Sequence, residues 1–152
     1  MTREECLEMV KNCGSDLYRV PEELKDKDVC LKAVKNGLAL EFVPKELIDR
    51  EMCLIAVKNN GLALRFVPEE LKDREICLIA VKNTGGSLQD VPLRLIDKDI
   101  CLEAVKNYGR ALKYIPKEYI TKELAKKAVQ NDYRSAINYI PNALILAMLF
   151  QD

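Results

Sequence analysis

The sequence predicts an all-α solenoid, a superhelix built from six short helical repeats of about 24 residues. Three observations predict it. The phrase "CLIAVKNNGLALRFVPEELKD", which starts at Cys53, recurs along the whole chain. Every copy carries its own helix-starting and helix-ending residues, and little of the chain has the alternating pattern of a strand. A fixed period of this length is typical of stacked units that bury their apolar faces against their neighbours.

A column of cysteines fixes the register of the repeats. Its members are Cys6, Cys30, Cys53, Cys77 and Cys101, with Ala125 at the same place in the sixth copy. The predicted repeats are 2–25, 26–48, 49–72, 73–96, 97–120 and 121–145, followed by a C-terminal capping segment, 146–152. We therefore expect residues 1–152 to form a single helical-repeat domain.

Each repeat should open with an α-helix of about three turns. A helix N-cap residue stands four positions before the cysteine column in every copy: Thr2, Asp26, Asp49, Asp73, Asp97 and Thr121. An acidic residue follows two positions later, which suits the positive end of the helix dipole. The helix should stop at Asn-Gly or Asn-x-Gly, because a glycine there can adopt positive φ.

A second, shorter helix should follow in each copy. In the third copy this is "LALRFV", and it must end near Phe66 because Pro68 disfavours helical geometry in the residue before it. The proline is suited to open the next turn, "PEELKD", since its missing N–H would have no partner there. Equivalent prolines stand in the other copies: Pro21, Pro44, Pro92, Pro116 and Pro141.

The two ends of the chain differ from the internal pattern. Glu5 and Lys126 occupy columns that are otherwise apolar, so we expect capping copies at both ends of a complete solenoid. The tail "NALILAMLFQD" is expected to fold back over the last copy as an apolar lid. Near its end, Ala147, Met148, Leu149 and Phe150 should cover another part of the structure. A monomer is the main expectation, and self-association through this segment is the alternative.

Composition argues against several classes of function. Lys plus Arg equals Asp plus Glu at 24 each, which disfavours nucleic-acid binding through phosphates. The longest strongly apolar run, "ALILAMLF", is eight residues and cannot span a bilayer, and the start of the sequence has no signal-peptide pattern. Histidine is absent, and no catalytic constellation is evident, so we expect no enzyme, no cofactor and no metal site.

The six cysteines are expected to be free thiols. Packed helices lie about 8–10 Å apart, whereas a disulfide needs Cα atoms within about 7 Å. The cysteine column is therefore predicted to hold small buried hydrophobes, which suits a reducing compartment. Cys13 lies outside the column and is the candidate for a reactive thiol.

Two columns of basic residues recur along the repeats. One stands at the first helical position: Arg3, Lys27, Arg50, Arg74, Lys98 and Lys122. We expect its members to pair with the glutamates four residues earlier, Glu23, Glu46, Glu70 and Glu118, with an acidic-partner site as the alternative. The other column lies in the last helical turn: Lys11, Lys35, Lys58, Lys82 and Lys106. The helix dipole explains that column.

The preferred candidate for a binding site is the pair Ile55 and Ile79. In the third helix, Met52, Cys53, Leu54, Ala56 and Val57 form the buried arc, and Ile55 falls on the outward stripe with Glu51 and Lys58. Ile79 repeats this arrangement in the next copy, where Glu75 and Lys82 flank it. An apolar centre with a polar rim is the anatomy of a protein-binding surface. A merely tolerant surface position is the alternative explanation.

The irregular stretch "TGGSLQD" gives a second candidate, an anion or small-ligand site. Gly85 and Gly86 would free backbone N–H groups for an anion. Ser87, Arg94 and Lys98 would complete it.

The A-V-K-N-x-G-x-A-L core, followed by P-x-E-L-x-D, resembles the helical repeats of domain-of-unknown-function family 4116. The resemblance covers essentially the whole chain and is clearest from Asp26 to Pro116. It implies an all-α repeat fold without established enzymatic activity. Members occur in bacterial and protist proteins, including effectors delivered into host cells, and at least one inhibits partner enzymes by binding them. The expected function is thus a protein-binding module, in the cytoplasm or delivered into a host cytosol.

Overall fold

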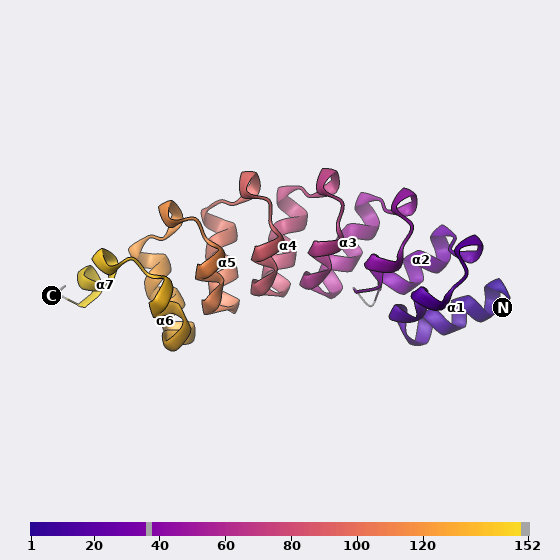
Figure 1. The fold of residues 1–152 in the computed structure, drawn as a ribbon, viewed down its shortest axis with the longest axis horizontal. Helices are drawn as coiled ribbons and strands as arrows, with labels where there is room; N and C mark the ends of the chain where they lie inside the picture. Colours follow the sequence, from indigo (N-terminus) through magenta and orange to yellow (C-terminus); the bar gives the residue numbers. More distant parts are fainter. Residues whose placement is uncertain (36–37, 150–152) are drawn as a thin grey trace.

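The computed structural model describes residues 1–35 and 38–149, and it confirms the all-α repeat architecture. The helices stack in one row that bends into an arch, with the two termini at opposite ends (Figure 1). The proline-led turns lie along the convex edge of the arch, and the C-terminal ends of the α-helices lie along the concave edge. Residues 1–35 and 38–149 include no strand.

Each of the first five copies contains an α-helix, a 3₁₀-helix and a short 3₁₀ turn, and in the sixth copy α7 follows the 3₁₀-helix in place of the turn. The α-helices of the described residues are α1 (Arg3–Asn12), α2 (Lys27–Val34), α3 (Arg50–Asn59), α4 (Arg74–Asn83), α5 (Lys98–Asn107), α6 (Lys122–Ala136) and α7 (Asn142–Leu149). The 3₁₀-helices are η1 (Gly14–Arg19), η3 (Leu38–Phe42), η5 (Gly61–Phe66), η7 (Gly85–Asp90), η9 (Gly109–Tyr114) and η11 (Ile137–Tyr139). The proline-led turns are η2 (Glu22–Leu24), η4 (Lys45–Leu47), η6 (Glu69–Leu71), η8 (Leu93–Leu95) and η10 (Lys117–Tyr119). The second helix of the first five repeats is thus the tighter 3₁₀ form, whereas in the sixth repeat it begins as the part of α6 that follows a kink at Asp132 and ends as η11.

The predicted N-caps are confirmed in all six copies. In α3, Asp49 Oδ1 accepts the Met52 backbone N–H at 2.8 Å, and Asp73 does the same for Ile76 in α4. Thr2 and Glu5 form a reciprocal capping box at the start of α1. These caps satisfy N–H groups that have no partner within the helix.

The predicted helix ending is wrong in its mechanism. The residue after each ten-residue helix is extended, with φ of −150° at Asn60 and −142° at Thr84, and the following glycines do not have positive φ. Glycine is needed at Gly61 and Gly85 for a different reason: a Cβ there would collide with a backbone carbonyl of the next copy's α-helix. The predicted ending at Asn36 and Gly37 lies outside the described residues.

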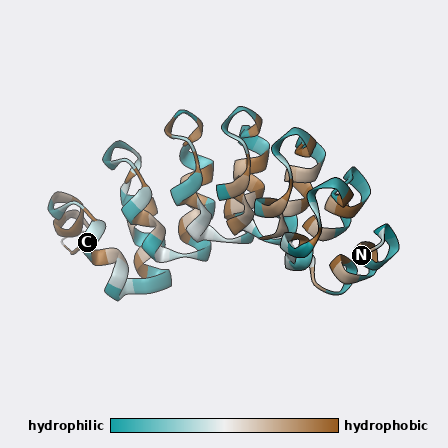
Figure 2. Ribbon diagram, turned by 45° about the vertical axis from the view of Figure 1, so that its right-hand side comes forward, coloured by the Kyte–Doolittle hydropathy of each residue, from teal (hydrophilic) through white to brown (hydrophobic). Residues whose placement is uncertain are grey.

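The core runs continuously through the stack, and hydrophobic residues recur along the ribbon from one copy to the next (Figure 2). Met52, Cys53, Ala56 and Val57 are all fully buried in α3. In the first copy, Glu5 has the register of Met52 but is exposed. That side of each α-helix therefore faces the preceding copy, which the first copy does not have. The cysteine column is confirmed as buried small hydrophobes.

The C-terminal lid is only partly as expected. Helix α7 crosses the predicted boundary at residue 146, because Pro141 opens a continuous helix instead of a short turn. Ile145 and Met148 are half-buried, whereas Leu149 is 70% exposed. Helix α7 contacts α6, and Leu144 also packs against the core, whereas Leu146 stays exposed like Leu149, so the segment covers the last copy only in part. Ala147 is half-buried, and Phe150 lies outside the described residues.

The two adjacent glycines of the fourth copy provide a matched test of this packing. Gly85→Ala should lower the free energy of unfolding by about 2 kcal/mol or more, since its Cβ has no space. Gly86→Ala should be neutral or stabilising by up to about 1 kcal/mol, because its Cβ would lie 3.9 Å from the Tyr108 ring. Urea unfolding followed by circular dichroism measures both. Equal effects of the two substitutions would contradict the steric explanation.

Candidate functional site

Ion pairs join successive copies along the convex edge. Arg50 Nε donates to Asp73 Oδ2 at 2.8 Å, and its Nη2 donates to Glu75 Oε2 at 2.6 Å. Asp73 Oδ1 meanwhile caps its own helix. Each capping aspartate thus joins its own helix to the preceding copy. We call these contacts the cap ladder; it comprises Arg3 with Asp26 and Asp28, Lys27 with Asp49, Arg50 with Asp73 and Glu75, and Arg74 with Asp97 and Asp99.

The basic column is therefore paired, but not with the predicted partners. Glu23, Glu46, Glu70 and Glu118 were expected to be those partners, and none of them forms an ion pair with the described part of the chain. The expectation assumed a continuous helix between the glutamate and the basic residue. Lys72 and Asp73 are instead extended, with ψ of 105° and 174°. The i,i+4 geometry is lost there, and Arg74 reaches forward to the next copy.

The cap ladder keeps its carboxylates ionised. The Arg3 guanidinium and the Val29 backbone N–H lower the pKa of Asp26 below its usual range. Lys27 and the Met52 N–H lower the pKa of Asp49 in the same way. All three arginines of this column, and Lys27, are thus engaged within the stack, which weakens the alternative that the column binds an acidic partner. Lys98 and Lys122 form no such pair with the described residues, and at the position where Lys98 would meet a capping aspartate the chain has Thr121.

The predicted anion site is not assembled. Ser87 is fully buried, and its hydroxyl donates to the Thr84 carbonyl at 2.6 Å. Arg94 lies on η8 and pairs at 2.7 Å with Glu69 on η6, the turn that precedes α4. Gly85 and Gly86 follow the other end of α4. The ten residues of α4 separate the two places by roughly 15 Å. Lys98 begins α5 on the same convex edge as Arg94, so the basic side chains cannot meet an anion at the glycines.

Ile55 and Ile79 lie on the neighbouring helices α3 and α4, which pack against each other. Both isoleucines are half-buried and contact the core, so they are less exposed than a free surface stripe would be. Their predicted rim, Glu51, Lys58, Glu75 and Lys82, is exposed throughout. Glu75 is held by Arg50, while Lys58 and Lys82 lie one turn beyond the isoleucines. The result is a shallow apolar spot with charged residues at both ends.

A second set of contacts between copies lies along the concave edge, and the sequence analysis missed it. Helices α3, α4 and α5 end in an asparagine, and Asn131 has the same register within α6. The side-chain amide of each donates to a carbonyl at the end of the preceding α-helix. We call this the asparagine ladder: Asn59 to Lys35, Asn83 to Lys58, Asn107 to Lys82 and Asn131 to Lys106. Asn83 Oδ1 also accepts the Gly61 N–H at 2.9 Å. The signal in the sequence is the recurrence of Asn at this position, which a local rule explains only as a helix stop.

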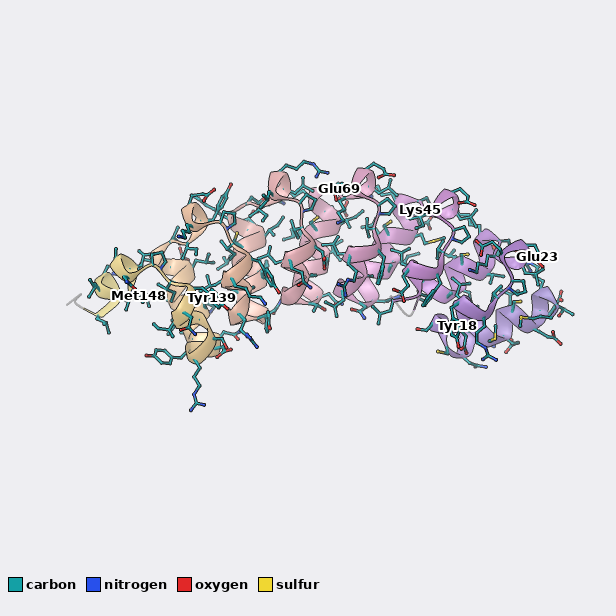
Figure 3. The ribbon with its side chains drawn as sticks, in the orientation of Figure 1. Tyr18, Glu23, Lys45, Glu69, Tyr139 and Met148 are labelled. Carbon is teal, nitrogen blue, oxygen red and sulfur yellow. The ribbon has the colours of Figure 1, made fainter. Side chains whose placement is uncertain are left out.

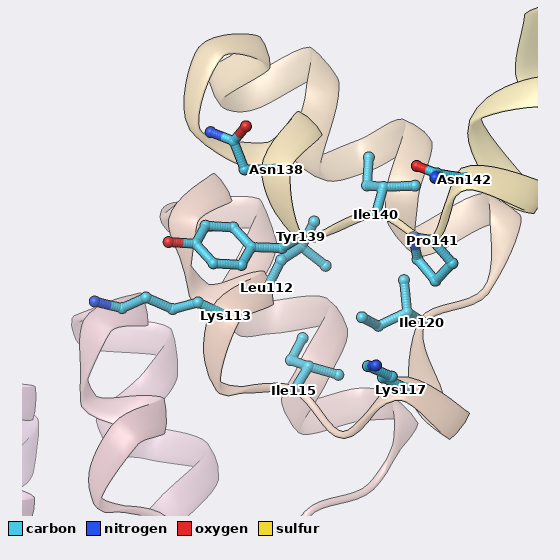
Figure 4. Close-up of a pocket in the computed structure, with 10 residues that line it drawn as sticks. All are labelled: Leu112, Lys113, Ile115, Lys117, Ile120, Asn138, Tyr139, Ile140, Pro141 and Asn142. Carbon is cyan, nitrogen blue, oxygen red and sulfur yellow. The ribbon is translucent and has the colours of Figure 1, made fainter.

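The side chains of the turns and of the 3₁₀-helices lie at different edges (Figure 3). Glu23, Lys45 and Glu69 lie on the proline-led turns at the convex edge, and Tyr18 lies on η1, away from that edge. A groove of about 400 Å³ separates the last two copies, between η9, η10 and η11 (Figure 4). Its floor is apolar, and none of its ten lining residues is a carboxylate. Such a groove offers no paired acid and base.

The cysteines differ sharply in environment. Burial raises the pKa of Cys30, Cys53, Cys77 and Cys101 to about 11, so these thiols stay protonated at neutral pH. Cys13 alone is exposed. Within residues 1–35 and 38–149, no group of three or more Cys, Asp or Glu side chains could hold a metal ion.

The chain is a helical-repeat protein, and comparison with protein families places it more closely. The model of the family "Domain of unknown function (DUF4116)" matches residues 2–48, 49–96, 73–120 and 97–145. These matches cover nearly the whole chain, so the chain belongs to that family, and each match spans two consecutive repeats. No curated protein and no solved structure shows significant similarity to it. None of the helices of the described residues has the length and apolar character that crossing a membrane requires.

The cap ladder predicts a specific dependence of stability on pH. The pKa of each ladder aspartate is lower in the folded protein than its unfolded value of 3.8. The contribution of these aspartates to folding stability is therefore complete above the unfolded pKa and is lost as pH falls through the folded pKa. Asp49→Asn with Asp73→Asn keeps both caps but should cost about 1 kcal/mol near pH 7. Its melting temperature should fall less on acidification than that of the native protein. Glu46→Gln with Glu70→Gln is the matched control and should behave like the native protein. If the glutamate variant lost more stability than the aspartate variant, the assignment of the aspartates as partners of the basic column would be wrong.

The thiols predict a simple labelling pattern. Iodoacetamide at about pH 8 should modify Cys13 alone in the folded protein, because a buried, protonated thiol is unreactive. In denaturant, all six cysteines should react. Intact-mass spectrometry counts the adducts, and Cys13→Ser should abolish native labelling. Labelling of Cys53 or Cys77 at the rate of Cys13 would show that the core opens readily.

Proposed function

We propose that this protein is a non-enzymatic protein-interaction module that binds a partner on the α-helical face of its third and fourth repeats. An adaptor or an effector-type inhibitor would use such a surface. The single observation that carries the proposal is the Ile55–Ile79 pair on neighbouring helices, with charged residues at both ends. An apolar centre with a polar rim is the usual anatomy of such interfaces.

The fold does not require isoleucine at these two positions. The same register holds Glu8, Lys32, Glu103 and Lys127 in the other copies. Glu103 is half-buried and forms an ion pair with Lys106 at 2.7 Å, so a charged side chain fits there. An apolar residue in two adjacent copies therefore supports a role outside folding.

The surroundings of the pair suit a binding surface. The cap ladder and the asparagine ladder hold α3 and α4 to each other at both ends, so the two isoleucines keep a fixed separation. A preformed surface binds at a smaller entropic cost than one that must first be ordered. The free thiols favour a reducing compartment, either the cytoplasm or a host cytosol reached by delivery.

The proposal is tested by affinity capture with matched variants. The native protein, an Ile55→Glu and Ile79→Glu double variant, and Leu93→Glu serve as baits in lysate of the source cell or its host. Leu93 is 77% exposed on the convex edge, so its substitution controls for a change from an apolar side chain to a charged one elsewhere. We expect a partner that the native and Leu93→Glu baits retain and the double variant loses.

Circular dichroism and thermal melting first establish that the double variant is folded. Retention of the same partner by all three baits would remove the isoleucine pair from the site. Loss of the partner with Leu93→Glu alone would move the site to the convex edge. Purified partner and calorimetry then give the affinity difference, which we expect to be at least about tenfold, or about 1.4 kcal/mol.

A further inference from the structure

The lysine column in the last turn of the α-helices is not uniform. In the first and fifth copies, Lys11 pairs with Glu8 at 3.3 Å and Lys106 pairs with Glu103 at 2.7 Å. In the second to fourth copies, the residue one turn earlier is Lys32, Ile55 or Ile79 instead of a glutamate. Four lysines there, Lys32, Lys35, Lys58 and Lys82, have no carboxylate within 4.0 Å among the described residues.

This cluster carries a positive charge that the helix ends do not cancel. A helix C-terminus is equivalent to about half a negative charge, so three helix ends offset about 1.5 of the four positive charges. The carbonyls of Lys35, Lys58 and Lys82 also already accept hydrogen bonds from the asparagine ladder. The nearest acidic residues on these helices lie at the other end, where Arg3 holds Asp28 and Arg50 holds Glu75.

We propose that this basic cluster, together with Ile55 and Ile79, binds an acidic polypeptide segment of the partner. The inference rests on the proposed function and names the chemistry of the partner. Carboxylates of the segment pair with the lysines of α2, α3 and α4, and apolar side chains between them lie on the two isoleucines. A groove of about 450 Å³ continues the surface between α1 and α2, where Leu7 and Leu31 lie with Lys11, Lys32 and Lys35. The groove also holds two carboxylates, Glu8 and Asp28, which are paired with Lys11 and Arg3.

The spacing of the repeats sets the spacing of the carboxylates. Packed helices lie about 8–10 Å apart, so the lysines of successive copies recur at about that interval. Three residues of extended chain in polyproline II geometry cover about 9 Å and bring the side chain back to the same face, and two turns of α-helix cover about 11 Å. A segment with a carboxylate at every third extended residue, or on every second helical turn, therefore meets one copy after another.

Nucleic acid fits this surface less well. The isoleucines would face a charged backbone, and the acidic ends of α2, α3 and α4 would lie close to phosphates. The glutamates of the first and fifth copies also neutralise the lysines there, which limits the positive surface to three copies. A short acidic segment with apolar residues matches both the extent and the composition of the surface.

Fluorescence anisotropy with a labelled peptide of repeated Glu-Leu-Asp triplets tests the inference. Binding is measured at about 0.1 M salt, where the screening length is about 10 Å. Lys58→Gln with Lys82→Gln should weaken binding at least about fivefold. Lys11→Gln with Lys106→Gln is the matched control, since it removes lysines at the same register, and it should change binding less than about twofold. Added salt should weaken binding of the native protein and of this control.

Several results would overturn the inference. These are the absence of peptide binding, equal effects of the two lysine pairs, or tighter binding of a single-stranded oligonucleotide than of the peptide. The captured partner separates this inference from the proposed function. If the isoleucine double variant loses the partner but Lys58→Gln with Lys82→Gln retains it, the interaction module stands and the acidic-segment assignment fails.

Discussion

The contact between each repeat and the next is the constraint on which the rest of the structure depends. A repeat of this length cannot bury its own apolar face, so Met52 and Ala56 need the preceding copy and Cys53 and Val57 complete the same core. The cap ladder fixes the N-terminal ends of adjacent α-helices, and the asparagine ladder fixes their C-terminal ends. Each polar contact contributes on the order of 1 kcal/mol or less. Because the contacts recur in successive copies, they hold each copy in the same position relative to the next.

The contacts between copies leave one surface of the α-helices free for binding. The core, the caps and the close approach of Gly61 and Gly85 to the next helix dictate most positions of a repeat. The outward position of each α-helix has no such demand, and it accommodates glutamate, lysine and isoleucine. Variation at that position changes the charge and polarity of the face without disturbing the contacts between copies. A family of such repeats can therefore present different surfaces on one scaffold.

Features that depend on local geometry could be predicted from the sequence, and features that depend on a neighbouring copy could not. The N-caps follow from a contact between residues three apart, so Asp49 and Asp73 were assigned correctly. The partner of Arg50 lies 23 residues away, and a local i,i+4 rule gave the wrong carboxylate. The function of glycine at Gly85 is a close approach of the next helix, which no local rule contains. The half-burial of Ile55 and Ile79 likewise comes from the crowding of neighbouring helices.

Hydrogen exchange of the native protein and of Asn83→Ala tests most directly whether the stack is held by contacts between nearest neighbours. Asn83 joins the end of α4 to α3 and η5. Its loss should accelerate exchange about fivefold in α3, η5 and α4, the factor expected for about 1 kcal/mol. Exchange in α1 and α6 should stay within error of the native protein. An equal acceleration in every helix would contradict this account, because it would mean that the repeats open as one cooperative unit.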